Sequence, residues 1–209
     1  MTVRWPALLD ILRRLIDASE ACGKRIGPVI VLVGGSAMAA HGLRADSRDV
    51  DMYTTDADDD VVASVEREMR PAYGPDFRID ITTIENIWGI VMVRDIASSP
   101  KMETIRSGSG QRYDVRVLSL ETLYVLKVVA GREQDISDID LIVRQTTADA
   151  IIARFNMLLS GIGNRTAIPA IADLLVDHLV RHYGLSANQV IDRLMVSDGT
   201  KIALREARI

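Results

Sequence analysis

The chain has 209 residues, 48% hydrophobic and 26% charged, so it can bury a sizeable core and is not expected to be disordered. Its formal net charge of −4 argues against a protein that coats nucleic acid through bulk positive charge, and local basic patches stay open. Apolar stretches such as Val29–Val33 are far shorter than a membrane helix, and Met1 leads into no signal-peptide core. We therefore expect a cytoplasmic chain without a membrane segment. A single cysteine, Cys22, excludes an internal disulfide and is expected to be a buried thiol.

Helix and strand patterns alternate along the front of the chain, which predicts a mixed α/β sheet. The predicted elements are a helix over 6–22, a strand buried on both faces over 29–33, a short helix over 36–41, a strand over 49–54, a helix over about 61–69 and a strand over 77–81. The acidic run between Asp56 and Asp60 is expected to be an exposed loop.

The rest of the chain turns from strands to helices. It contains strand candidates at 90–93, 102–106 and 112–117, a turn at 107–110, a deeply packed helix over 120–130, and helical sequence from 134 onward with breaks near 161–164 and at 184. The expected boundary lies near Thr147. It separates an α/β part, residues 1–147, with a formal charge of −5, from a near-neutral helical part, residues 148–209.

Two aspartates on one predicted strand are the first candidates for chemistry. Asp49 and Asp51 are two residues apart, so their carboxylates project from the same face with Cα atoms roughly 6.5–7 Å apart. That spacing suits one Mg²⁺ ion, or two ions about 3.5–4 Å apart as in phosphoryl-transfer sites. Asp80, on the polar face of a later strand, reaches the same point if the two strands are neighbours. The alternative is that these carboxylates simply face water.

A glycine turn, Gly34-Gly35-Ser36, lies between a buried strand and a helix. Backbone N–H groups and the Ser36 hydroxyl at such a junction can bind phosphate oxygens. The turn is not a P-loop, because no Gly-Lys-Ser/Thr follows, and it does not match the dinucleotide Gly-x-Gly-x-x-Gly fingerprint. A plain tight turn is the alternative interpretation.

Together, Val31-Leu-Val-Gly-Gly-Ser36 and Asp49-Val-Asp51-Met resemble the first motifs of the nucleotidyltransferase superfamily, which has a DNA polymerase β-like fold. The stretch from Val117 through Lys127 to Asp138 is similar to later motifs of the AbiEii-type, toxin-like branch of that superfamily. This resemblance covers about residues 29–145. One departure is that Ala45 stands where a basic residue is expected, with Arg44 one place early. Ser47 stands where a Thr or Ser is expected.

The resemblance implies an enzyme that moves an NMP from an NTP to an acceptor hydroxyl with Mg²⁺ as cofactor. Asp49, Asp51 and Asp80 would be the catalytic and metal-binding residues. The residues expected to bind the nucleotide are Gly34, Gly35, Ser36, Lys127 and Asp138. The fold implied is a nucleotidyltransferase-like mixed sheet flanked by helices, with residues 1–147 as the catalytic core.

The acceptor stays open at this stage. The toxin-like branch implies RNA, such as a tRNA 3′ end, with a cognate antitoxin protein as partner. An aminoglycoside or lincosamide antibiotic and a protein hydroxyl are alternatives. A chain that keeps the fold but only binds nucleotide, without catalysis, is the competing class.

Lys127 lies within the apolar arc of its predicted helix, so its charge needs an anionic partner. By resemblance the partner is a nucleotide phosphate. The alternatives are a lysine that reaches the surface or one that pairs with a structural carboxylate. Asp135 and Asp138 could orient Lys127 or Arg132, or serve as a helix cap and a solvated side chain.

His178 and His182 have the i, i+4 spacing of a helical zinc pair. The sequence shows neither a His-Glu-x-x-His signature nor a third ligand. A solvated helix face is therefore the preferred interpretation.

Overall fold

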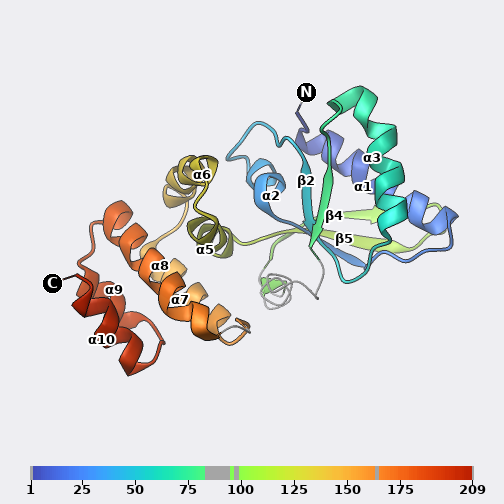
Figure 1. Cartoon of the computed structure of the whole chain (residues 1–209). Helices are drawn as coiled ribbons and strands as arrows, with labels where there is room; N and C mark the ends of the chain where they lie inside the picture. The colour runs from blue at the N-terminus through green and yellow to red at the C-terminus, as the bar shows by residue number, and fades with distance from the viewer. Residues whose placement is uncertain (1, 83–94, 97–98, 163–164, 209) are drawn as a thin grey trace. The chain divides into compact units, whose positions relative to one another are not determined.

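The structure is a computed structural model that describes residues 2–82, 95–96, 99–162 and 165–208. The chain divides into two compact units, Met1–Ser119 (the first unit) and Leu120–Ile209 (the second unit). Figure 1 shows that the strands belong to the first unit and that the second is helical. The expected α/β class with a helical C-terminal part is confirmed. The strand expected over 90–93 lies outside the described residues.

The sheet of the first unit has five strands among the described residues, in the order β3-β2-β1-β5-β4. Their bounds are β1 Val29–Leu32, β2 Val50–Tyr53, β3 Ile79–Thr82, β4 Lys101–Arg106 and β5 Arg112–Val117. β1 pairs antiparallel with β2 and parallel with β5, while β3 pairs parallel with β2. β4 and β5 form the expected antiparallel hairpin. β1 thus lies at the centre of the sheet, which explains its nearly complete burial.

The helices described in the first unit are α1 Trp5–Ala21, α2 Gly34–Ala40 and α3 Asp59–Tyr73. α1 buries the apolar stripe that its sequence predicts and packs next to α3 (Figure 1). α3 begins within the acidic run that was expected to be a loop. Asp58 caps it by accepting a hydrogen bond from the Val61 N–H, and Asp59 and Asp60 occupy its first turn. Acidic side chains are favourable there because the helix N-terminus carries partial positive charge.

The prediction that Cys22 is buried is wrong. The residue is exposed, and its thiol forms no disulfide. The physical reason is that α1 ends at Ala21. Cys22 is the C-cap residue and follows Ser19, the last buried residue of α1.

The second unit is built from helices. They are α5 Leu120–Ala130, α6 Glu133–Val143, α7 Ala148–Leu159, the 3-10 turn η1 Arg165–Ala167, α8 Ile168–Tyr183, α9 Ala187–Arg193 and α10 Asp198–Glu206. α5 packs against α6, α7 and α8, so the division between units falls before Leu120 and not near Thr147 as expected. Tyr124 and Phe155 are fully buried in this helical core. Within the described ranges, no helix combines the length and apolar character needed to cross a membrane.

Candidate functional site

The sheet topology brings the three predicted aspartates to one edge. β2 runs antiparallel to β1, so the start of β2 lies beside the end of β1, where the Val33 N–H donates to the Asp51 carbonyl at 3.0 Å. β3 runs parallel to β2 with Asp80 directly opposite Asp51. Paired residues of neighbouring strands project from the same face, so the side chains of Asp51 and Asp80 leave the sheet on the same side. Asp49 lies in a bend one residue before β2, close enough for its charge to act on both of them.

The glycine turn is fitted against Asp51. The Gly35 N–H donates to Asp51 Oδ2 at 2.7 Å. Gly34 has a φ of +50°, and a Cβ atom added there would lie 2.6 Å from the same oxygen. A Cβ atom at Gly35 would lie 2.5 Å from Ser47 Oγ. Both positions therefore need glycine for close approach, and Gly34 needs it for its backbone conformation as well.

Ser36 is buried and joins the turn to the start of β2. Its hydroxyl accepts a hydrogen bond from the Asp51 N–H at 2.9 Å and donates to the Asp49 carbonyl at 3.3 Å. The Ser36 side chain therefore ties the glycine turn to the backbone of both Asp49 and Asp51. Its expected contact with phosphate stays a prediction.

Asp49 has cationic and backbone partners. Its Oδ2 accepts from Arg48 Nε at 3.0 Å, and its Oδ1 accepts from the Arg78 N–H at 3.3 Å. The Arg48 side chain is 85% exposed, so this ion pair is weak in water and can exchange.

Burial and mutual repulsion set the charge of the site. Burial raises the pKa of Asp51; the Gly35 N–H opposes this shift, and the negative charge of Asp80 reinforces it. Burial also raises the pKa of Asp80, with the charge of Asp49 as the next cause. Carboxylates that repel one another across an oxygen-rich site are a donor set that suits Mg²⁺.

The carboxylates suit Mg²⁺ in chemistry but are not assembled around a single point. Among the described residues, no group of three or more His, Cys, Asp or Glu side chains is placed to hold a metal ion. Asp51 faces the Gly35 N–H, and Asp49 faces Arg48 and Arg78. Each carboxylate keeps lone pairs that a metal could use, but the three are not gathered around one point in this structure, so the magnesium site stays a prediction.

The Gly35 N–H group, which the sequence predicts as a phosphate donor, already has an acceptor. It donates to Asp51 Oδ2. A phosphate at the turn would therefore share this N–H with the carboxylate or displace the carboxylate from it.

Lys127 lies in a buried ion-pair cluster of the second unit. Its Nζ is 2.9 Å from Asp135 Oδ1 and 2.5 Å from Asp138 Oδ2, and the residue is 5% exposed. Arg132 Nε donates to Asp135 Oδ2 at 2.7 Å. Burial opposes ionisation of Asp135, but hydrogen bonds from Arg132 and Lys127 hold the pKa of that carboxyl below its ordinary value. The structure thus shows a lysine paired with structural carboxylates, one of the alternatives left open by the sequence.

The phosphate-binding role expected for Lys127 and Asp138 stays a prediction. In this structure the ammonium group already has two carboxylate partners, so a phosphate would have to compete with them. Asp135 also accepts from the Arg132 backbone N–H at 3.3 Å, which makes it the capping carboxylate at the start of α6.

The two histidines of α8 are partly buried and not fully solvated as expected. Their rings stack with centroids 5.7 Å apart, and His182 Nδ1 lies 3.6 Å from Asp140 Oδ1. Burial lowers the pKa of His178, and the neighbouring His182 lowers it further. The described part of the chain offers this pair no third ligand suited to a metal.

Sequence reasoning missed two contacts at the aspartate site. Ser47 closes the space beside Gly35, and the Arg78 N–H reaches Asp49 from the neighbouring strand. The strand pattern at 77–81 is visible in the sequence, but its register against β2 is not. Only that register places the Arg78 N–H next to Asp49.

A comparison of the chain with models of known protein families finds no match, and neither does a search of curated proteins. Support for a function therefore comes from the sequence motifs and from the geometry between residues 34 and 80.

Proposed function

We propose that the chain is a Mg²⁺-dependent nucleotidyltransferase that moves an NMP from an NTP to an acceptor hydroxyl and releases pyrophosphate. The register of β2 and β3 carries this proposal, because it sets Asp80 opposite Asp51, with Asp49 one residue before β2. The glycine turn adds a backbone N–H group directly beside Asp51 that can donate to a phosphate oxygen.

Each part of the edge has a role in this proposal. Asp49, Asp51 and Asp80 would hold Mg²⁺, which when bound neutralises charge on the reacting phosphate. The N–H group of Gly35 would bind a phosphate oxygen of the NTP, which shares this N–H with Asp51 or displaces its carboxylate. Asp80, which is exposed and has a raised pKa, would take the proton of the acceptor hydroxyl.

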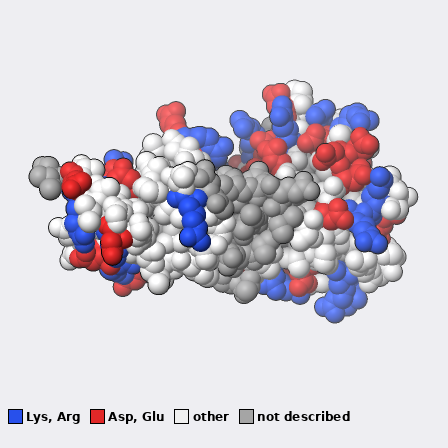
Figure 2. Space-filling view, turned by 60° about the horizontal axis from the view of Figure 1, so that its bottom comes forward, with Lys and Arg blue, Asp and Glu red and all other residues white. Residues whose placement is uncertain are grey.

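RNA, with a tRNA 3′ end as the model acceptor and an antitoxin as protein partner, is the acceptor class we favour. The resemblance to the toxin-like branch supports it, and the exposed Arg48 beside Asp49 is a suitable phosphate contact. Figure 2 shows Lys and Arg side chains interspersed with Asp and Glu, so RNA would bind through a local group of arginines. An antibiotic or a protein hydroxyl are the other acceptors within the same proposal.

A non-catalytic nucleotide-binding module is the second candidate. The observation that favours it is that Asp49 and Asp51 both have protein partners, without a three-carboxylate group assembled among the described residues. Such a chain would bind NTP at the turn and leave it intact.

One experiment separates the two candidates. The full chain is incubated with each labelled NTP, Mg²⁺ and total tRNA, and both label transfer and equilibrium nucleotide binding are measured. We expect transfer that falls at least about 10²-fold in Asp51→Asn and in Asp80→Asn. Asp56→Asn is the matched control, since Asp56 is exposed and follows the opposite end of β2. Binding without transfer to RNA, antibiotic or protein identifies the module, and absence of NTP binding contradicts both candidates.

A further inference from the structure

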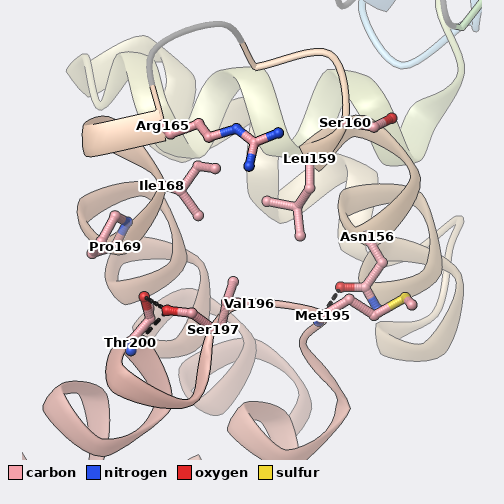
Figure 3. A pocket seen from close by; sticks show the side chains of 10 residues that line it. All are labelled: Asn156, Leu159, Ser160, Arg165, Ile168, Pro169, Met195, Val196, Ser197 and Thr200. Carbon is pink, nitrogen blue, oxygen red and sulfur yellow. Dashed lines mark hydrogen bonds between the residues drawn. The ribbon is translucent and has the colours of Figure 1, made fainter.

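A cavity in the second unit is lined by none of the residues of the candidate functional site. It has a volume of about 470 Å³ and is formed by the end of α7, the start of α8 and the segment between α9 and α10 (Figure 3). Pockets for small organic ligands begin at about 300 Å³, so this one is large enough for a small molecule.

The lining combines an apolar wall with a single charge. Leu159, Ile168 and Val196 contribute apolar surface, and Met195 lies at the rim with 77% of its surface exposed. Of the described residues that line the cavity, Arg165 alone is charged. Its side chain extends over the cavity, above Leu159 and Ile168 (Figure 3).

The guanidinium group of Arg165 is available to bind an anionic ligand. No described residue is an ion-pair or hydrogen-bond partner of its guanidinium group. A planar guanidinium binds a carboxylate through two parallel hydrogen bonds. One cation without a neighbouring acid in the lining matches a ligand with one negative charge.

The wall opposite α8 is held in place. The Asn156 side chain donates from Nδ2 to the Arg193 carbonyl at 2.9 Å and accepts at Oδ1 from the Met195 N–H at 2.8 Å. These two bonds tie α7 to the segment that carries Met195 and Val196. The cavity is therefore formed before a ligand arrives, which lowers the ordering cost of binding.

We propose that this cavity binds a small organic monocarboxylate, with the apolar body against Leu159, Ile168 and Val196 and the carboxylate on Arg165. Met195 covers the apolar body from the rim. This site is independent of the nucleotidyltransferase proposal, because it shares no residue with the aspartate edge.

The test uses the full-length chain with methionine methyl groups labelled for NMR. Octanoate is the probe, octanamide carries the same apolar body without the charge, and acetate carries the charge without the body. We expect octanoate to shift the Met195 methyl signal saturably, with a Kd on the order of 1 mM for a ligand of this size. Octanamide and acetate should bind at least about tenfold more weakly. The Met157 methyl, on α7 but outside the lining, is the internal control.

Arg165→Gln should weaken octanoate binding about tenfold and leave octanamide binding unchanged. Arg181→Gln, which removes an exposed arginine of α8 outside the lining, should change neither. Thermal melts establish that both variants fold. The proposal is overturned if octanoate and octanamide bind equally, if Arg165→Gln has no effect, or if Met157 responds as strongly as Met195.

Discussion

The carboxylate of Asp51 occupies the space that a Cβ atom on residue 34 would need. The calculated separation from Asp51 Oδ2 is 2.6 Å, well inside van der Waals contact, and Gly34 also has a left-handed φ of +50°. The glycine turn and the Asp51 carboxylate are thus in close steric contact. A substitution at either position is expected to displace the other.

Gly34→Ala is expected to destabilise the fold by about 2–3 kcal/mol, because it adds a steric contact to backbone strain of about 1 kcal/mol or more. Gly42→Ala is the matched control. Gly42 has a φ of +70° with open space around its Cβ position, so that variant should show the strain alone. Denaturant unfolding measures both. Equal losses would contradict the contact, and in an Asp51→Ala background the excess cost of Gly34→Ala should shrink, because only the Cβ atom of residue 51, 3.1 Å from the new Cβ position, remains.

Asp51→Asn is expected to make the protein more stable at pH 7 even though it abolishes the proposed transfer. Burial raises the pKa of the Asp51 carboxyl above its ordinary 3.8, so the folded chain takes up a proton more readily than the unfolded chain. The charged carboxylate therefore costs stability above the raised pKa, and this cost disappears as the pH falls through it. The gain from the substitution should be about 0.5–2 kcal/mol at pH 7, shrink as the pH falls through the raised pKa, and be gone below the ordinary value of 3.8.

Thermal melts of the parent and the Asn variant across that pH range test the sign. Asp56→Asn is the reference for an exposed aspartate. A variant less stable than the parent at pH 7 would mean that the hydrogen bond from Gly35 outweighs burial at this carboxylate.

Lys127→Met should destabilise the second unit by about 3–5 kcal/mol, since it leaves two buried carboxylates without their shared cation. Arg132→Gln should cost only about 0–1 kcal/mol, because the Arg132 side chain is 74% exposed. Unfolding monitored by circular dichroism compares the two. A small loss for Lys127→Met together with weakened NTP binding would instead assign Lys127 to the nucleotide.

Mg²⁺ should change the environment of the Gly35 N–H. If the ion draws Asp51 away, the hydrogen bond at 2.7 Å breaks and the Gly35 amide signal moves in an NMR titration. The Gly42 amide serves as control. Gly42 lies beyond the end of α2, and its N–H donates to the Ala39 carbonyl. A Gly35 signal that stays in place while Mg²⁺ binds elsewhere would argue against coupling between cation and turn.

Much of the secondary structure follows from local pattern. The helix at Leu120–Ala130 has the expected bounds, and β1 differs from the expected strand by one residue. Apolar periodicity and glycine turns are local signals, so a single sequence carries them. The start of α3 was misplaced because an acidic run reads as a loop until Asp58 is recognised as its cap.

Features that depend on contacts between residues far apart in the sequence were harder to predict. The sequence predicts Asp49, Asp51 and Asp80 as one group, but the partners that hold the first two are the Gly35 N–H of the turn, Arg48, and the Arg78 N–H just before β3. The unit boundary was misplaced because α5 reads as a continuation of the α/β part, while its packing partners are α7 and α8. The sequence alone does not single out Arg165, because its proposed role depends on the cavity that it lines.

The central strand has consequences for synthesis of the chain. β1 is made early, yet one of its two neighbours, β5, consists of residues 112–117. During translation the middle of the sheet therefore stays open on one side until residues 112–117 have left the ribosome. An apolar strand with free backbone donors is prone to pair with other chains, so the nascent first unit depends on protection during that interval. Ribosome-bound chains arrested before residue 112 should accordingly be protease-sensitive and should gain resistance once β5 has emerged.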